Sequence, residues 1–403
     1  MQTEVGVIPE DWAVASLQDA CQETITYGIV QCGKHVNNGI PYVRVSDMDK
    51  PDLDVDGMLR TSPAIAARFS RSTVQQGDLV YALRGKLGEV RQVSSSVAGA
   101  NLTQGTARLS PKEGVLSDYL MWSMRSSHVV RQSEVEAKGT TFREITLEDL
   151  RHICLPIAPI PEQRAIAVAL SDVDSLLGGL ERLVLKKRNL KQAAMQQLLT
   201  GQTRLPGFSR EWEIERLGDL AEMASGGTPL SSVSAYYGGG IPWVSIADMT
   251  RAGRVIDRTE KTLTLLGLEK SVAQMFPAGT VLYAMYASLG ECSIAGMPVC
   301  TSQAILGIRP KRDLHNGFLY YFLTLLKTTV KSLGQQGTQS NLNKGMVEDF
   351  RFPLPSCEEQ TAIATVLADM DAEISALLAR SDKTRALKQA MMQELLTGKT
   401  RLV

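Results

Sequence analysis

A long segment with a helical pattern occurs twice in this chain, and its second copy lies 197 residues after the first. Aligned without a gap, residues 162–205 and 359–402 share 24 identities in 44 positions. Both copies end in the same pattern, L-L-T-G-x-T-R-L. A weaker repeat precedes each helix: residues 40–43 match 241–244, and residues 77–89 match 279–291. The chain is therefore interpreted as a tandem duplication.

Composition limits the class of protein. The 403 residues are 44% apolar and 21% charged, which is typical of globular protein and leaves room for two to four domains. The first residues lack the pattern of a secretory signal, and no stretch reaches about 18 uninterrupted apolar residues. We therefore expect a cytoplasmic protein without membrane contact.

Cysteine and histidine do not form a ligand pattern. The six cysteines have no C-x-x-C spacing, so reduced and mostly buried thiols are expected. His128 and His315 have no suitably spaced neighbours, so no metal site is expected. Asp172 and Asp174, like Asp369 and Asp371, stand two residues apart and so face different ways on a helix. This favours a charge in an early helical turn or an interhelical polar contact over acid–base catalysis.

Net charge is zero. Residues 1–160 carry 16 basic and 19 acidic side chains, and residues 206–357 carry 14 and 13. Any binding to DNA must therefore depend on local patches or on a partner protein, and weak binding by the isolated chain is expected.

Apolar residues in both helices step by 3 and 4 positions, which is the 3.5-residue repeat of a coiled-coil seam. Pro161, the sequence Ser356-x-x-Glu359, and Gly201 and Gly398 mark helix starts and ends. An antiparallel pair of helices of about 38 residues is predicted; the alternative is that each helix packs on its own domain. The seam residues are Ile166, Leu170, Val173, Leu177, Leu180, Val184, Ile363, Leu367, Met370, Ile374 and Leu377.

Two further features lie toward the end of each helix. Beyond Val184 the seam becomes polar, with lysines and arginines at positions 186–191 and 383–388. Apolar patches follow, which could bind a partner protein or belong to a core. They consist of Met195, Leu198 and Leu199, and of Met391, Met392, Leu395 and Leu396.

The segments before the helices have short strand patterns separated by Gly, Pro, Asn and Ser, with helices expected at 117–131 and 318–332. The predicted fold class is α+β: a strand-rich domain followed by a long helix, repeated in tandem. The predicted boundaries are 1–160 and 206–355 for the domains, and 161–205 and 356–403 for the helices. Strands are expected at 42–45, 78–83, 106–109, 243–246, 280–285 and 304–308.

A proline-flanked strand, then E-Q-x-x-I and a long helix, occurs at Leu155-Pro156 to Leu170 and again at Pro353 to Leu367. This pattern resembles the specificity subunit of Type I restriction-modification systems, and the resemblance covers the whole chain. Two departures are noted: Tyr27-Gly28-Ile29-Val30 stands where the second repeat has Gly226-Gly227-Thr228-Pro229, and Arg84 has no basic counterpart.

The resemblance implies two target-recognition domains, each recognising one half of a bipartite DNA sequence, separated by the two spacer helices. It further implies two docked adenine-N6 methyltransferase subunits that use S-adenosylmethionine, and restriction subunits that use ATP and Mg. No cofactor, metal or catalytic residue is expected in this chain. The sequence agrees, because it has no adenine-methyltransferase signature, phosphate-binding loop or G-x-G-x-x-G.

Base recognition needs side chains that present hydrogen-bond donors and acceptors from loops. The predicted DNA-binding residues are Lys34, His35, Arg44, Arg84, Lys86, Thr141 and Arg143 in the first repeat, and Thr228, Ser231, Ser232, Tyr286, Ser288, Gln336, Gln339 and Asn341 in the second. Lys138, Lys331 and Lys344 are predicted phosphate contacts. The second set is the less charged one.

Two other functions compete with DNA recognition. An autonomous nucleic-acid enzyme is disfavoured because the sequence has no catalytic constellation. A coiled-coil scaffold that binds only proteins remains the main alternative, but it does not explain why the loops diverge between repeats while the framework persists.

Overall fold

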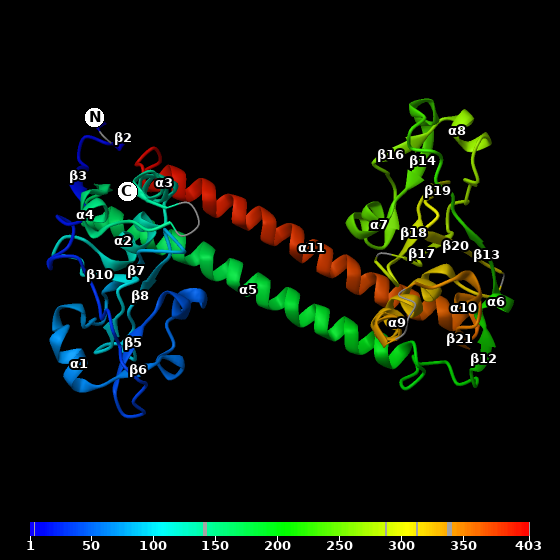
Figure 1. The fold of residues 1–403 in the computed structure, drawn as a ribbon, viewed down its shortest axis with the longest axis horizontal. Helices are drawn as coiled ribbons and strands as arrows, with labels where there is room; N and C mark the ends of the chain where they lie inside the picture. Colours follow the sequence, from blue (N-terminus) through cyan, green and yellow to red (C-terminus); the bar gives the residue numbers. More distant parts are fainter. Residues whose placement is uncertain (4, 140–142, 287, 312, 337–340, 403) are drawn as a thin grey trace. The chain divides into compact units, whose positions relative to one another are not determined.

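The structure is a computed structural model that describes residues 1–3, 5–139, 143–286, 288–311, 313–336 and 341–402, with the backbone alone at 332–336. It divides into two compact units, Met1–Glu181 with Ala379–Val403, and Arg182–Leu378. Each unit holds one strand-rich domain and parts of two long helices, α5 (Ile160–Leu198) and α11 (Cys357–Leu395) (Figure 1). This division cuts both helices, whereas the sequence-based division kept each helix whole.

A four-stranded antiparallel sheet of order β4-β10-β7-β8 forms the centre of the first domain. A smaller sheet has the order β6-β5-β9, in which β5 and β9 are parallel. Two two-stranded sheets, β1-β2 and β3-β11, complete the domain. The strands are β1 (Gln2–Thr3), β2 (Gly6–Val7), β3 (Ala13–Ser16), β4 (Thr26–Tyr27), β5 (Ile40–Val43), β6 (Arg60–Thr61), β7 (Leu79–Ala82), β8 (Val90–Gln92), β9 (Asn101–Leu102), β10 (Thr106–Leu109) and β11 (Cys154–Ile157).

The helices of the first domain are short. They are α1 (Pro63–Arg68), α2 (Ser117–Met124), α3 (Ser127–Glu136) and α4 (Leu147–His152), with 3-10 turns η1 (Val45–Asp49), η2 (Val55–Gly57) and η3 (Ser70–Ser72). The prediction of one helix over 117–131 is wrong. The Ser126 hydroxyl accepts a hydrogen bond from the backbone N–H of Val129 and caps a new helix, so α2 and α3 are separate.

The second domain repeats this plan with a five-stranded sheet of order β13-β20-β17-β18-β15 and a smaller sheet of order β16-β14-β19. Its β14 and β19 are parallel, like β5 and β9. The strands are β12 (Glu213–Arg216), β13 (Ala221–Ser225), β14 (Tyr237–Val244), β15 (Val255–Ile256), β16 (Lys261–Leu263), β17 (Val281–Ala284), β18 (Cys292–Ala295), β19 (Cys300–Thr301), β20 (Ile305–Pro310) and β21 (Arg351–Leu354), and β12 pairs with β21. The helical elements are α6 (Leu217–Leu220), η4 (Ser234–Tyr236), α7 (Ile246–Ala252), α8 (Leu265–Glu269), α9 (Asn316–Gln336) and α10 (Lys344–Glu348). The predicted α+β tandem duplication is confirmed.

Each long helix begins with a buried glutamate and glutamine. The Gln163 carboxamide donates to the carbonyls of Gly114 and Ala158 and accepts from the N–H of Leu116, and Gln360 repeats this with Asp313, Pro355 and His315. These bonds satisfy backbone groups of the preceding domain, which fixes where the helix leaves it.

The glutamates form a clamp with the end of the other helix. Arg204, just beyond α5, donates to both carboxylate oxygens of Glu359 at 2.6 Å, and Trp212 Nε1 donates to Glu359 Oε2 at 3.0 Å. At Glu162, Arg401 Nε donates to Oε1 at 2.6 Å and Trp12 Nε1 donates to Oε2 at 2.9 Å, while the other Arg401 nitrogens donate to Asp11. The Ser356-x-x-Glu359 pattern is typical of a capping box, but the box is only half formed. Ser356 accepts from the N–H of Glu359, whereas the Glu359 carboxylate is bound to Arg204.

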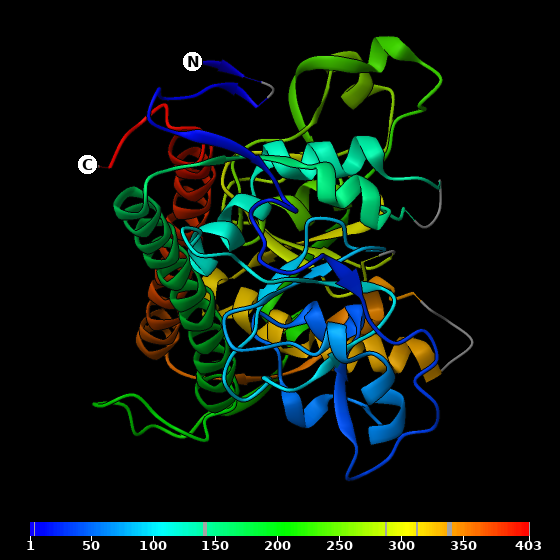
Figure 2. The same cartoon turned by 90° about the vertical axis from the view of Figure 1, so that its left-hand side faces the viewer.

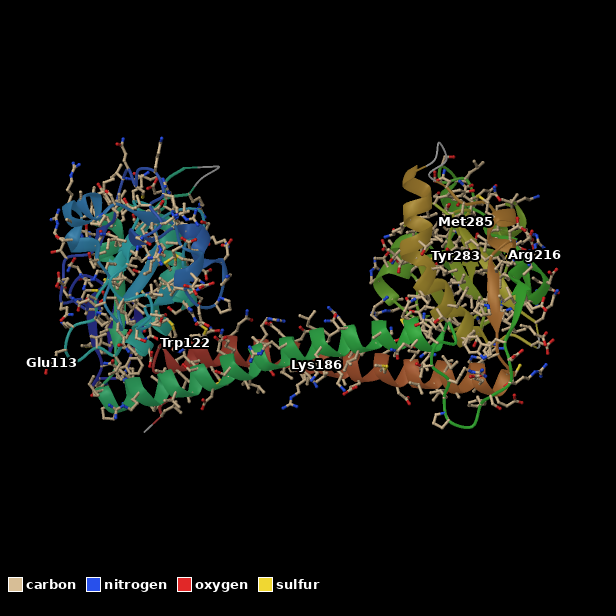
Figure 3. All side chains as sticks on the ribbon, turned by 90° about the horizontal axis from the view of Figure 1, so that it is seen from below. Glu113, Trp122, Lys186, Arg216, Tyr283 and Met285 are labelled. Atoms are coloured by element: carbon tan, nitrogen blue, oxygen red, sulfur yellow. The ribbon has the colours of Figure 1, made fainter. Side chains whose placement is uncertain are left out.

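A second charged contact joins the helices within each unit. Lys191 bonds Asp371 at 2.5 Å and lies over the Tyr321 ring, and the Tyr321 hydroxyl donates to the same carboxylate at 2.7 Å. Lys388 bonds Asp174 at 2.5 Å and lies over the ring of Trp122, which Figure 3 shows beside the helix pair. The polar part of the seam thus contains interhelical ion pairs, and the order of their partners makes the pairing antiparallel within each unit. Figure 2 shows the two long helices from one end.

The predicted antiparallel helix pair is confirmed, and the apolar part of the seam adds a contact with the domains. Ile166 and Leu170 pack with Trp12, Tyr119 and Trp122 of their own domain as well as with the end of α11. Pairing of the helices and packing of each helix on its own domain, the two alternatives from the sequence, therefore occur together. Ile166, Leu170, Leu177, Leu180, Val184, Ile363, Leu367 and Ile374 are buried, and Val173, Met370 and Leu377 are half-buried.

The terminal apolar patches belong to cores. Met195, Leu198 and Leu199 pack into the core of the second domain, and Leu395 and Leu396 pack into the helix contact of the first, with Met391 and Met392 partly buried there. Cys21, Cys292 and Cys300 are buried, Cys32 and Cys154 are half-buried, and Cys357 is exposed. Fewer thiols are buried than the sequence suggested.

We expect Glu359→Gln to destabilise the protein by about 2–4 kcal/mol, because the change removes a charge-assisted pair at a side chain that is only 1% exposed. The midpoint of urea unfolding measures the loss. Glu358→Gln is the matched control: it changes an exposed neighbouring carboxylate and should stay within about 0.5 kcal/mol. Equal midpoints for the two variants would contradict the clamp.

Candidate nucleic-acid interface

Loops at one end of the first domain's sheets surround a cleft of about 670 Å³. They follow β4, β5, β7 and β9, and the segment at Glu144 completes the wall. The polar lining includes Tyr42, Arg44, Ser46, Arg84, Thr103, Gln104 and Glu144. Two of the predicted DNA-binding residues, Arg44 and Arg84, therefore come together in one concave polar site.

Arg44 is held in place before any ligand arrives. Its Nε and Nη2 donate to the Asp47 carboxylate at 3.1 and 2.7 Å, and its backbone N–H donates to the same group at 2.8 Å. These hydrogen bonds raise the pKa of Arg44 above its ordinary value. A guanidinium has five N–H donors, so three remain for a ligand in a fixed direction.

Arg84 is exposed, and among the described residues its guanidinium has no hydrogen bond or ion pair. The backbone of Arg84 bridges Glu144, and the N–H of Gly85 donates to the carbonyl of Arg143 at 3.2 Å. Arg143 therefore lies beside the cleft, and so does Lys86, which pairs with Asp49 of η1.

The other predicted residues of the first domain lie elsewhere or are partly engaged. Lys34 and His35 are exposed on the loop after β4 but do not line the cleft, and His35 Nδ1 accepts from the N–H of Arg60 at 3.1 Å. Thr141 falls outside the described residues. Lys138 is exposed, and its backbone pairs with Glu144.

In the second domain, equivalent loops bring a neutral set together. The N–H of Leu342 donates to the carbonyl of Met285 at 3.1 Å, which places Asn341 beside the loop of Tyr286 and Ser288. Asn341 and Tyr286 are exposed, and Ser288 is half-buried.

The remaining predicted residues of the second domain are spread along exposed segments. Thr228 accepts from the N–H of Gln303 at 3.4 Å, and Ser231 and Ser232 follow it in an exposed loop. The side chain of Gln336 and all of Gln339 lie outside the described residues. Lys331 is exposed, and Lys344 pairs with Glu348 at 3.6 Å.

The apparent lack of a glycine turn in the first repeat is resolved by the backbone. The N–H of Ile29 bonds the carbonyl of Leu102, as the N–H of Gly227 bonds that of Thr301, so Gly28 corresponds to Gly226. A Cβ at Gly28 would lie 1.9 Å from the Leu102 carbonyl oxygen, and one at Gly226 would lie 2.0 Å from Thr301 Oγ1. Both domains need glycine here because two loops cross in contact.

The polar cleft residues that were not predicted from the sequence are Tyr42, Ser46, Thr103, Gln104 and Glu144. Glu144 lies in the loop before α4, where nothing in the local pattern marks it. Gln104 has a counterpart, Gln303, but at an offset of 199 residues rather than the 197 of the helices. A comparison of the repeats allowing for different loop lengths would have found it.

The described residues contain no group of three or more His, Cys, Asp or Glu side chains placed to hold a metal ion. None of the described helices is long and apolar enough to cross a membrane.

Comparison with known proteins agrees with this architecture. The profile of the Type I restriction modification DNA specificity domain matches residues 9–186 and again 209–383. The chain belongs to this family. Along its whole length it is 24% identical to a protein named as a putative type I restriction enzyme MjaX specificity subunit of Methanocaldococcus jannaschii, covering 96% of that relative.

Two solved structures of this family share the fold over nearly the full chain. The HsdS subunit from Thermoanaerobacter tengcongensis is 19% identical with a TM-score of 0.51, over 99% of this chain and all of that one. The S subunit from M. genitalium is 17% identical with a TM-score of 0.60, over 96% of both chains. The chain is a Type I DNA specificity subunit, as its sequence pattern indicated.

We expect Gly226→Ala to destabilise the second domain by about 2–3 kcal/mol, because the new methyl group overlaps Thr301 and the crossing loops must separate. Thermal unfolding of the purified chain measures this. Gly240→Ala, where a Cβ would meet nothing within 4 Å, is the control and should leave the transition almost unchanged. A normal transition in Gly226→Ala would show that the loops do not depend on this crossing.

Proposed function

We propose that this specificity subunit recognises a bipartite DNA target, with one half-site bound by each domain, inside a Type I restriction-modification complex. The observation that carries the proposal is the pairing of two like frameworks with unlike loops. Arg84 and Glu144 in the first domain correspond to Tyr286 and Asn341 in the second. The correspondence follows from equivalent backbone hydrogen bonds, which the N–H groups of Ile145 and Leu342 donate in their own domains. A scaffold that bound the same protein twice would have no need of this difference.

The partners and cofactors follow from family membership as further parts of the proposal. Two adenine-N6 methyltransferase subunits, using S-adenosylmethionine, dock on the helices and domains, and restriction subunits contribute ATP- and Mg-dependent cleavage. Catalysis resides in those partners, and the complex acts on DNA in the cytoplasm. Weak intrinsic DNA affinity fits this division, because the first domain has more acidic than basic side chains.

The two half-sites are recognised by different chemistry. In the first domain Arg44 and Arg84 present guanidinium donors from one cleft, and a guanidinium matches the O6 and N7 acceptors of guanine. In the second domain Tyr286, Ser288, Asn341 and Thr228 offer neutral donors and acceptors. We propose that guanine recognition belongs to the first half-site.

The test is a domain exchange. Replacing residues 206–355 by those of a family relative, in a strain that also expresses the partner methyltransferase, should change one half of the methylated sequence and leave the other half intact. Mapping N6-methyladenine across the host genome by single-molecule sequencing gives the result. An unchanged methylated sequence would reject DNA recognition by this domain and favour the protein-binding scaffold.

Arg84→Ala should weaken binding of the methyltransferase complex to its target duplex by about tenfold to a hundredfold and relax discrimination at one base pair of one half-site. Competition binding with single-base variants of the duplex measures both effects. Arg164→Ala, an exposed arginine near the start of α5, serves as the control. An equal loss of affinity for every sequence would make Arg84 a phosphate contact instead.

A further inference from the structure

One turn is the same in both domains, although the loops on each side of it differ. It joins β9 to β10 in the first domain and β19 to β20 in the second. The N–H groups of Thr103 and Ser302 donate to the carbonyls of Val43 and Val244, at 3.1 and 2.9 Å. A second backbone hydrogen bond closes each turn in the same way. The N–H of Thr106 donates to the carbonyl of Thr103 at 3.1 Å, and the N–H of Ile305 donates to that of Ser302 at 3.0 Å.

Both turns carry glutamine at the same place. Gln104 lines the cleft of the first domain and is half-buried, and Gln303 is exposed. The backbone N–H of Gln104 donates to the carbonyl of Ile29, and that of Gln303 donates to Thr228 Oγ1. Among the described residues neither carboxamide has a hydrogen-bond partner. The backbone holds the turn, so the fold itself does not explain why the side chain is glutamine twice.

The surroundings of the two glutamines are the variable loops. On one side lies the loop of Ile29 or Thr228. On the other, the N–H of Leu83 donates to Gly105 and that of Met285 donates to Ala304, which brings the loops of Arg84 and Tyr286 next to the turn. Because glutamine is the same in both turns while the loops around it differ, it suits a function that both half-sites share.

We propose that Gln104 and Gln303 each contact the adenine that is to be methylated in their own half-site, before that base is drawn out of the duplex. The inference rests on the proposed function, in which an adenine is the one element that both half-sites must contain. A carboxamide matches the major-groove edge of adenine: its oxygen accepts from N6–H and its N–H donates to N7. Methyltransferases act on an extruded base, so this contact belongs to the recognition step.

The experiment uses the complete chain with its methyltransferase and a target duplex already methylated on one strand, so that a single adenine is assayed. Gln104→Ala should lower kcat/KM for one half-site by about tenfold to a hundredfold and leave the other unchanged, and Gln303→Ala should do the reverse. The unaffected half-site shows in each case that the complex is folded. Gln76→Ala, an exposed glutamine outside the cleft, is the matched control.

A modified base separates direct contact from a structural effect. With 7-deazaadenine at the methylated position the N7 acceptor is absent while N6 is kept. The unaltered complex should lose rate on this duplex, and Gln104→Ala should lose no more than it has already lost. Full activity of Gln104→Ala, or a further full loss on the modified duplex, would overturn the inference. If the unaltered complex methylates no bipartite sequence at all, the proposed function fails first and this inference with it.

Discussion

The structure depends on a buried carboxylate at the start of each long helix. Glu162 and Glu359 are almost fully buried, and each accepts hydrogen bonds from an arginine beyond the end of the other helix and from a tryptophan. Arg204 donates two bonds to Glu359, whereas Arg401 donates one to Glu162 and two to Asp11. A buried charge without such partners would be strongly destabilising, so the first turn of one helix and the last turn of the other must meet. The register of the antiparallel helices is thereby fixed within each unit, and Lys191 with Asp371 and Lys388 with Asp174 extend it.

The two clamps differ in how the clamping segment is connected. Gly201 and Gly398 both end a helix with positive φ, and each packs against a tryptophan, Trp212 or Trp12. After Gly201 the chain continues directly into the second domain. At the other end Arg401 instead makes an added ion pair with Asp11, at 2.8 Å. Arg401 thereby links Asp11 to Glu162 within the first unit.

Much of this could be predicted from the sequence because the signal was long and repeated. The 3.5-residue apolar step and the duplicated ending indicated two paired helices, and they are 39 residues each. The partners of Glu162 and Gln163 could not be found in this way, because the contacts join residues far apart, such as Glu162 and Arg401. Local pattern also failed at Ser126, where a single hydroxyl divides one apolar period into two helices.

The candidate interface was harder to predict because the informative side chains lie on loops whose lengths differ between repeats. Arg44 and Arg84 could be predicted from their residue type and their place in the sequence. Gln104 could not, because only the backbone hydrogen bonds show that its turn matches that of Gln303.

The charges around the first cleft affect how it can attract DNA. The cationic groups around the first cleft have acidic neighbours: Asp47 holds Arg44, Asp49 holds Lys86, and Glu144 lies across from Arg84. Pairing of this kind orients a donor while it cancels the long-range field that would attract any DNA. Under the proposed function, such a subunit discriminates between sequences through the geometry of its donors and takes its general affinity for the duplex from its partners.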